Sequence, residues 1–435
     1  MLNLGIVLAI LISIFLGYKL KINTGIPAII FAYLIGCFGM GLSTKEIISA
    51  WPVNIMFSIM AVTFFYGFAL ENGTLEMLSI YLLYIFRKFF KLLPFLLFFV
   101  AMFITAMGAG NFAVVAFMAP LTMLICDKMH MSKIIGAISI NAGSLAGGNF
   151  MTSNLGVIFR GLMDTAINDS GLFSEFDSFT CCLILFCTSI LFSVSLIAIF
   201  RFGVKGNRNI GQNFNIEKPQ VTAEHKKTMM LMATMLAIVL LFPITHIFFP
   251  DKGMITMINK KIDVSLVSMV FVILALILKI APQKAAFARI PWSTILMVCG
   301  VGMLIQIAIT AGTIKMLGQW VTSNIPTVLI PVAFGVIAGI MSFFSSTIGV
   351  VAPTLFPLIP GIAAATNLNP YLLFVTTVIG SQSTAISPFS ASGSLIVGCC
   401  TTEKERNELF NRLITRAVPV SMGLAVAFGL IMNCI

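Results

Sequence analysis

The long stretch from residue 316 to residue 402 contains no Lys, Arg, Asp or Glu. About a quarter of the residues in a soluble domain are charged, whereas in this chain 9% are charged and 59% are hydrophobic. Long apolar runs recur along the rest of the chain as well. In lipid such runs cross as helices, because each unpaired peptide group is costly there. The sequence therefore predicts an all-α polytopic membrane protein.

The distribution of cations orients the predicted helices. The formal net charge is +11, but Lys and Arg gather at the ends of apolar runs and in the polar segment 201–227. Cytoplasmic loops are enriched in these residues. Five crossings before residue 210 and five after it put the cationic loops inside, with the lysines of loop 250–263 as the exception. We therefore expect the acidic loop 164–177 and both termini outside, and no nucleic-acid partner.

Two apolar blocks, 92–126 and 325–363, are interrupted in the middle. The first block breaks at "GAGN" (108–111), which leaves arms of about 15 residues, or about 23 Å of helix. Such an arm is shorter than a hydrocarbon core of about 30 Å. The second block breaks near 345–347 and has somewhat longer arms. Both blocks are predicted to be re-entrant hairpins.

Three short matches relate the two halves of the chain. "ENGTLEML" (71–78) resembles "TAGTIKML" (310–317), and "FMTSN" (150–154) resembles "FSASG" (389–393), both at an offset of 239. "VVAFMAPL" resembles "VVAPTLFPL" at an offset of 236 to 237. Two halves of five crossings have opposite orientations in the membrane. The sequence thus predicts an inverted repeat of five crossings plus one re-entrant hairpin each.

Two further segments, 141–154 and 380–394, are rich in Gly, hydroxyls and amides and carry no charge. Pro388 is expected to stop a helix in the second segment. Carbonyls freed by such breaks can coordinate Na⁺, and N–H groups at half-helix starts can hold an anion. An alternative is that these small residues only allow close helix packing.

Titratable groups are absent from the middle of these segments, which bears on the coupling ion. Proton-coupled carriers usually use an intramembrane carboxylate or a His relay, but His130, His225 and His246 lie near the ends of apolar runs. Na⁺ coupling is therefore favoured, and H⁺ coupling stays open. No HExxH, GxSxG or Walker loop is found. We expect no enzyme and no cofactor, while a channel remains a third possibility.

The residues of the hairpin and of the first Gly-rich segment carry a family resemblance. Through "INTGIPAII", "STKEIISAWP", "ENGTLEML", "GAGNFAVVAFMAPL" and "INAGSLAGGNF", roughly residues 1–165 resemble the malonate-carrier (MatC-type) dicarboxylate transporters. More broadly the chain resembles the ion-transporter superfamily, which includes the divalent anion:sodium symporters. The resemblance implies a Na⁺-coupled secondary transporter of malonate-like or C4 dicarboxylates. It also implies a homodimer in which a transport domain moves as an elevator against a scaffold.

Symporters of that superfamily carry a Ser-Asn-Thr motif at each hairpin tip. This chain has Gly110-Asn111-Phe112 at the first tip, which keeps the Asn, and Ser345-Ser346-Thr347 at the second, which keeps Ser and Thr. The segment 144–154 is similar to the Gly-rich unwound helix of the family that ends in Pro-Pro-Asn, with only Asn154 kept.

These observations give two sets of candidate site residues. The candidates for binding substrate are Gly110, Asn111, Thr152, Ser153, Asn154, Ser346, Thr347, Ser390 and Ser392. The candidates for binding a cation are Gly108, Asn111, Ser144, Gly148, Asn149, Ser345, Thr347, Ser383 and Thr384.

The predicted organisation follows the repeat, the charges and the resemblance, with the apolar, basic-ended stretch 74–91 lying along the membrane interface. Its parts are scaffold half 1 (1–91), transport half 1 (92–200, with the hairpin 92–126 and the broken helix 134–163), a cytoplasmic linker (201–227), scaffold half 2 (228–323) and transport half 2 (324–435, with the hairpin 325–363 and the broken helix 371–400). The composition suits a bacterial inner membrane. A cation/proton antiporter, or a carrier of another anion such as citrate or sulfate, stays open.

Overall fold

The computed structural model describes residues 2–20, 22–85, 92–203, 218–248, 261, 263–344, 346–400 and 402–433. Within these residues the regular structure is entirely helical, and six helices are long and apolar enough to cross a membrane, or seven if one strongly bent pair is counted as a single span. Five further apolar helices are 10–17 residues long. The predicted all-α polytopic architecture is confirmed.

The helices of the first half are α1 (Leu2–Leu20), α2 (Gly25–Tyr33), η1 (Leu34–Gly39), α3 (Thr44–Ser49), α4 (Val53–Glu71), α5 (Thr74–Ile85), α6 (Leu93–Ala106), α7 (Asn111–Lys128), α8 (Lys133–Gly148), α9 (Asn154–Ser170) and α10 (Ser178–Gly203). The label η marks short π or 3₁₀ turns.

The helices of the second half are α11 (Ala223–Phe248), α13 (Val264–Ile277), α14 (Gln283–Ala288), α15 (Trp292–Thr310), α16 (Thr313–Asn324), η3 (Thr327–Leu329), α17 (Ile330–Phe344), η4 (Thr347–Val351), α18 (Ala352–Leu355), η5 (Phe356–Leu358), α19 (Ile359–Thr366), α20 (Pro370–Ser383), α21 (Ala391–Gly398), α22 (Glu403–Arg412), η6 (Leu413–Ala417) and α23 (Val418–Asn433).

Three consecutive helices of the first half have counterparts of the same length in the second half. The bounds of α3, α4 and α5 return as those of α14, α15 and α16 after a shift of 239 residues. The residues that start and end the middle pair match too: Pro52 and Pro291 precede α4 and α15, and Gly73 and Gly312 follow them with φ of +73° and +74°. This spacing equals the offset of two of the three sequence matches.

Helix partners also recur between the halves. Helix α6 packs along α8 as α17 packs along α20, whereas α2 packs on α15 as α13 packs on α4. The pairs α6 with α8 and α17 with α20 depend on glycine for their close approach. A Cβ on Gly143 of α8 would collide with the carbonyl of Phe98, and one on Gly380 of α20 with the carbonyl of Gly335. Gly143 and Gly380 therefore allow close helix packing, which was the alternative role considered for the small residues of these segments.

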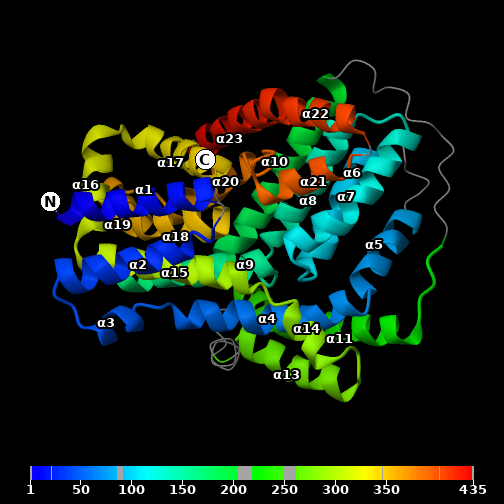
Figure 1. Ribbon diagram of the computed structural model, residues 1–435, viewed down its shortest axis with the longest axis horizontal. Coiled ribbons are helices and arrows are strands. Elements are labelled where there is room, and N and C mark those ends of the chain that lie inside the picture. Colours follow the sequence, from blue (N-terminus) through cyan, green and yellow to red (C-terminus); the bar gives the residue numbers. More distant parts are fainter. Residues whose placement is uncertain are drawn as a thin grey trace.

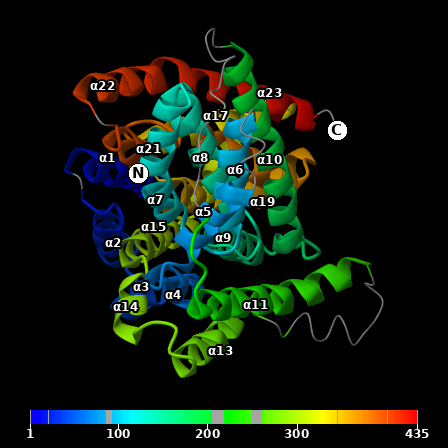
Figure 2. The same cartoon turned by 90° about the vertical axis from the view of Figure 1, so that its right-hand side faces the viewer.

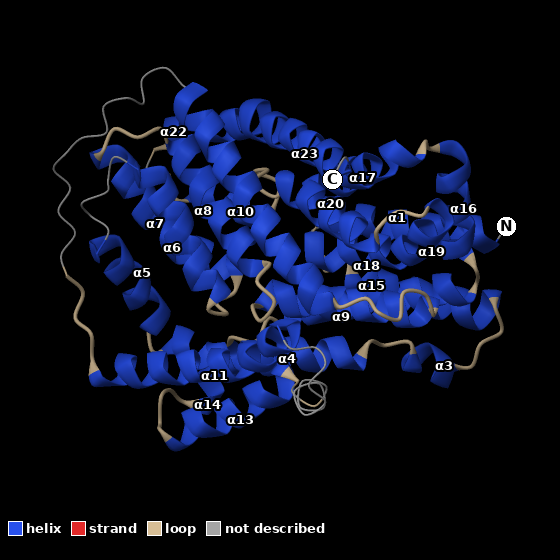
Figure 3. Cartoon of the chain, turned by 180° about the vertical axis from the view of Figure 1, so that it is seen from behind, coloured by secondary structure: helices blue, strands red, loops and turns tan. Residues whose placement is uncertain are grey.

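The elements are spread along one long axis. In Figure 1, α1, α2, α3 and α16 lie at the end that holds the N-terminus, and α5, α6, α7 and α22 lie at the other end. Figures 1 and 2 agree that α22 and α23 lie along one face and α11, α13 and α14 along the opposite one. Figure 3 shows the reverse side, where α8, α10 and α20 occupy the middle. The interrupted helices therefore meet in the interior.

Several observed bounds differ from the predicted ones. Helix α9 continues beyond the predicted end at 163. It ends at Ser170, since the following Gly171 adopts the left-handed conformation of a C-cap. Helices α10 and α11 extend into the predicted linker from both sides. Of the stretch 74–91, residues 74–85 form α5, and 86–91 lie outside the described residues.

Candidate functional site

The first hairpin tip joins α6 to α7 and is shaped by glycine. Gly108 has a φ of +101°, and a Cβ at this position would collide with the ring of Tyr66 on α4. This left-handed conformation strongly favours glycine. Helix α7 then begins at Asn111, whose side chain is 4% exposed and has no hydrogen-bond partner within the described ranges. The tip thus presents a buried amide at a helix start.

The first interrupted helix breaks at residues 149–153, between α8 and α9. Ser153 is the N-cap of α9: its hydroxyl oxygen accepts from the Gly156 N–H at 3.3 Å, and the hydroxyl donates to the carbonyls of Phe150, at 2.8 Å, and Gly148. A serine in this position satisfies helix groups that would otherwise lack partners. Ser153 therefore holds the break together.

The second interrupted helix breaks at residues 384–390 and uses the same device. Ser390 caps α21 by accepting from the Gly393 N–H at 3.1 Å, and it donates to the carbonyls of Ser387 and Ala385 at 2.7 and 2.6 Å. Ser153 and Ser390 are 237 residues apart, whereas the sequence match at 239 pairs Ser153 with Ser392. The register of that match is wrong by two residues.

A reciprocal amide pair connects the two breaks. The Asn149 Nδ2 donates to Gln382 Oε1 at 2.9 Å, and the Gln382 Nε2 donates to Asn149 Oδ1 at 2.7 Å. Asn149 also donates to the Ser189 hydroxyl of α10 at 2.7 Å. The ends of α8 and α20 are thereby fixed to each other across 233 residues of sequence.

Both tips and both breaks meet around a cavity of about 70 Å³. Five of the predicted residues line it, together with side chains that the sequence did not single out, and none of them carries a charge. The lining consists of Asn111, Phe112, Leu145, Leu155, Ser342, Ser346, Thr347, Ile348, Gln382, Ala385, Ser390 and Ser392. We call this space the central cavity.

Helix starts give the central cavity its electrostatic character. Its lining includes residues from the N-terminal turns of α7, α9 and α21, such as Asn111, Leu155 and Ser392. Each helix start carries a partial positive charge and free N–H groups. The site can therefore attract a small anion without any Lys or Arg.

Other predicted residues lie beside the central cavity. Thr152 Oγ1 and Asn154 Oδ1 are buried and have no hydrogen-bond partner among the described residues. Gly110 lies next to Asn154, since a Cβ on it would be 3.8 Å from the Asn154 Nδ2. These polar atoms form a group at the first tip that could hold a ligand.

Several predicted cation ligands instead make local contacts. Ser144 donates to the Asn141 carbonyl, Ser383 to the Gly380 carbonyl, and Thr384 to the Gly339 carbonyl. A Cβ on Gly148 would press on Leu155.

At the second tip Ser346 caps η4 and Thr347 lies 3.2 Å from the Ser342 hydroxyl. Ser345 lies outside the described residues.

Larger pockets lie at both ends of the molecule. Two, of about 600 and 570 Å³, adjoin each other between α9 and α15 and share Ala166, Asp169, Ile309 and Pro357. They contain none of the predicted residues. They are lined by helices of the predicted scaffold and of the predicted transport halves.

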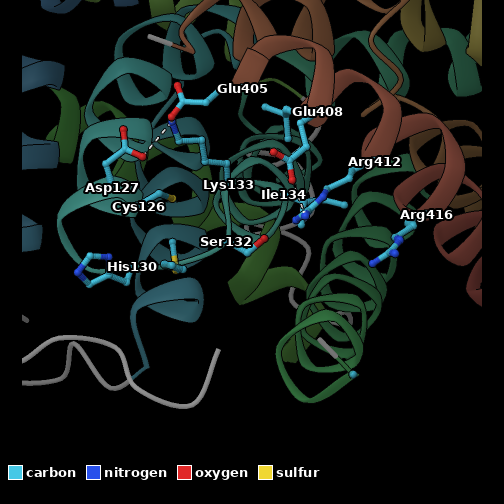
Figure 4. A pocket seen from close by; sticks show the side chains of 13 residues that line it. Cys126, Asp127, His130, Ser132, Lys133, Ile134, Glu405, Glu408, Arg412 and Arg416 are labelled. Carbon is cyan, nitrogen blue, oxygen red and sulfur yellow. Dashed lines mark ion pairs between the residues drawn. The ribbon is translucent and has the colours of Figure 1, made fainter. Parts of the chain in front are cut away.

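A third large pocket, of about 600 Å³, lies at the corner between α7 and α8 (Figure 4). Lys133 pairs there with Asp127 at 2.9 Å and with Glu405 of α22 at 2.8 Å. Burial of Lys133 disfavours its charge, but its hydrogen bonds to the two carboxylates outweigh this and raise its pKa. These charges pair mainly with one another, so the pocket is better explained as a joint between α8 and α22 than as the ligand site.

Gln382 is the functional candidate that the sequence analysis missed. It lies inside the quoted segment 380–394 and is an amide in a charge-free stretch, which is the same signal that singled out Asn111 and Asn154. Applying that criterion to every amide of the four segments would have found it.

Three comparisons with known proteins bear on this site. Residues 1–148 match the family model described as "Dicarboxylate carrier protein MatC N-terminus". The curated proteins give no match. A solved structure, described as that of the YdaH transporter of Alcanivorax borkumensis with "an unusual topology", superposes with a TM-score of 0.61 at 13% identity, over 89% of this chain and 86% of that one. The family match supports a transporter, and the structural match, at 13% identity, shows a shared fold alone.

Proposed function

We propose that this protein is a secondary active transporter of small carboxylates, malonate-like or C4 dicarboxylates, and that transport is coupled to Na⁺. The observation that carries the proposal is the central cavity, where two hairpin tips and two helix breaks meet without any charged side chain. Cavities at broken helices in the membrane interior are typical of secondary transporters. The match of residues 1–148 to a dicarboxylate carrier family supports the choice of substrate class.

In the proposed site the substrate carboxylate lies against helix starts. Backbone N–H groups at the starts of α7 and α9 donate to the anion, and the Asn111 amide and Ser392 hydroxyl add side-chain donors. The central cavity, at about 70 Å³, is smaller than an ordinary ligand pocket, so we propose a compact dicarboxylate as the substrate.

Na⁺ is proposed as the coupling ion because neutral oxygens are abundant at the site and titratable groups are not. Thr152 Oγ1 and Asn154 Oδ1 are buried and have no partners among the described residues, and hard cations prefer oxygen ligands. No Asp, Glu or His is among the described residues that line the central cavity. A proton-coupled carrier would be expected to place such a group there.

We further propose that the two halves are inverted in the membrane and that the transport halves move as an elevator against the scaffold of a homodimer. The recurring pairs α6 with α8 and α17 with α20, and the separate pairs α2 with α15 and α13 with α4, support this division. An inner-membrane location with both termini outside completes the proposal.

Uptake into proteoliposomes tests the proposal. Labelled malonate or succinate should accumulate under an inward Na⁺ gradient, and Asn111→Ala should lower uptake by about tenfold or more, because a hydrogen bond to a charged ligand is lost. Asn168→Ala, the same change at an exposed position near the end of α9, is the matched control and should be neutral. Uptake indifferent to Na⁺ would replace Na⁺ by H⁺ as the coupling ion. The absence of carboxylate uptake under any cation gradient would overturn the proposal, and non-saturating flux without counterflow would indicate a channel.

A further inference from the structure

A second void lies behind the central cavity, in the centre of the helix bundle. It measures about 20 Å³ and is enclosed by α8, α10, α20, η6 and α23. Leu145 and Gln382 line both spaces, so these two side chains form the common wall. We call this space the inner void. It holds none of the residues that were predicted to bind substrate.

Polar side chains without partners surround the inner void. Asn141 is 3% exposed, and its Oδ1 is buried without a hydrogen-bond partner in the part of the chain that the structure describes. Ser193 and Ser421, which are 4% and 1% exposed, also line the void, and their hydroxyls make no hydrogen bond within the described ranges. Buried polar atoms are nearly always satisfied, by protein, by water or by an ion. The buried Asn141 Oδ1, which has no partner among the described residues, and two serine side chains on other helices therefore indicate a bound species.

The size of the inner void restricts the bound species to one small particle. A space of about 10–15 Å³ holds a single water molecule, so the observed volume of about 20 Å³ suits one water or one dehydrated monovalent cation. An organic anion cannot enter such a space. The occupant is either a water molecule or a cation.

The helix ends around the inner void distinguish it from the central cavity. Leu145 and Ala146 come from the last turn of α8, and Ile379, Gln382 and Ser383 come from the end of α20. Among the described residues, no helix start contributes to this lining, apart from that of α23 after the π turn η6. A helix C-terminus carries a partial negative charge, which favours a cation. The central cavity shares Leu145 and Gln382 with this lining, but it adds residues from the starts of α7, α9 and α21.

We propose that the inner void is a binding site for a monovalent cation of the size of Na⁺, held by the oxygens of Asn141, Ser193 and Ser421. The inference rests on the proposed Na⁺ coupling and gives one coupling ion a location. It adds residues on α10 and α23 that neither the sequence motifs nor the comparisons assign.

The common wall links this cation to the substrate. Gln382 uses one N–H and its carbonyl oxygen for the pair with Asn149, which leaves one N–H of its amide group. A cation in the inner void attracts the side-chain carbonyl oxygen of Gln382. The remaining N–H of the same amide group is then free to donate to an anion in the central cavity. Each ligand then increases the affinity for the other by the same factor.

The test uses purified full-length protein without carboxylate, with NaCl exchanged for choline chloride at constant ionic strength. Na⁺ should raise the midpoint of thermal unfolding in a saturable manner, since a ligand of the folded state stabilises it. Ser193→Ala and Ser421→Ala should each raise the half-saturating Na⁺ concentration about tenfold, because each removes one oxygen ligand. Ser195→Ala on the same helix α10, where the exposed hydroxyl donates to the Leu191 carbonyl, should leave this concentration unchanged.

The outcomes separate this inference from the proposed function. If Na⁺ stabilises the wild-type protein and both serine variants with the same half-saturating concentration, the cation binds elsewhere and only this inference fails. The inference also fails by itself if the variants change basal stability without changing the Na⁺ dependence, because the void then holds water. If wild-type protein shows no response to Na⁺, the proposed Na⁺ coupling fails together with the inference. Each variant loses a single oxygen, so the test does not depend on a larger change such as Asn141→Ala.

Discussion

The two helix breaks of the molecule share their frame and differ in their polar content. At 149–153 and at 384–390 a serine caps the following half-helix, and a glycine three residues later, Gly156 or Gly393, lies against the carbonyl of Phe150 or Ser387. Around this common frame the first break contributes Thr152 and Asn154, whereas the second is longer and contains Pro388. The shared frame indicates that serine and glycine build the break, and we propose that the amides and hydroxyls around them bind the ligands.

The largest expected effect comes from the paired glycines. In Gly156→Ala and Gly393→Ala a Cβ would collide with backbone carbonyls, which cannot move without opening the break. Each variant should lose about 1–3 kcal/mol of stability, by the usual cost of overpacking, and the two losses should be similar. Thermal unfolding measures both. Gly423→Ala on α23, where a Cβ meets nothing within 4 Å, is the control. A fully stable Gly393→Ala would show that the two breaks are not built alike.

An effect of similar size is expected for the amide pair that joins the breaks. Asn149→Ala and Gln382→Ala each leave a buried amide without its partner, at a cost of about 1–3 kcal/mol. The double variant should cost less than the two single variants added together, because neither amide remains to be orphaned. A double-variant cycle by thermal unfolding gives this coupling. Strict additivity would mean that the observed pair contributes nothing to stability.

The smallest effect is expected for the two capping serines, and it tests which residues of the two halves correspond. Ser153→Ala and Ser390→Ala should each lose about 1 kcal/mol, the usual value of an N-cap, whereas Ser392→Ala should keep its stability and weaken carboxylate binding. Thermal unfolding with and without a dicarboxylate separates the two behaviours. If Ser392 proved to be the stabilising serine, the sequence match at an offset of 239 would be correct after all.

Much of the fold followed from the sequence because lipid leaves few alternatives. Apolar runs without charge must be helical, and Gly-rich polar segments inside them predicted interruptions near 149–153 and 384–390, where α8 and α20 end. The sequence offset between corresponding residues of the two breaks could not be predicted in the same way. Helices α3 to α5 repeat at 239 residues, but the caps repeat at 237, because the lengths of the connecting loops differ. Loops tolerate such changes, and short matches across them slip easily.

The site was only partly accessible from the sequence, for a related reason. The position of Asn111 on the cavity wall could be predicted from its place at a hairpin tip, because that depends on local sequence. The contact of Gln382 with Asn149 depends on how α8, α10 and α20 pack, and no local pattern encodes that packing. Ser193 and Ser421 look like ordinary helix residues until α10 and α23 are placed beside α8.

The exchange of partners between the halves has a consequence for biosynthesis. Helix α2 packs against α15, and α4 packs against α13, so neither of these first-half helices meets its partner within its own half. At the ribosomal rate of ~5–20 residues per second, the segment that covers α2 is made on the order of ten seconds or more after α2 itself. Until then, the small-residue face of α2, with Gly25, Ala28 and Ala32, waits in the translocon or in lipid. Newly made chains cut between the halves should therefore be substrates for membrane quality control rather than stable fragments.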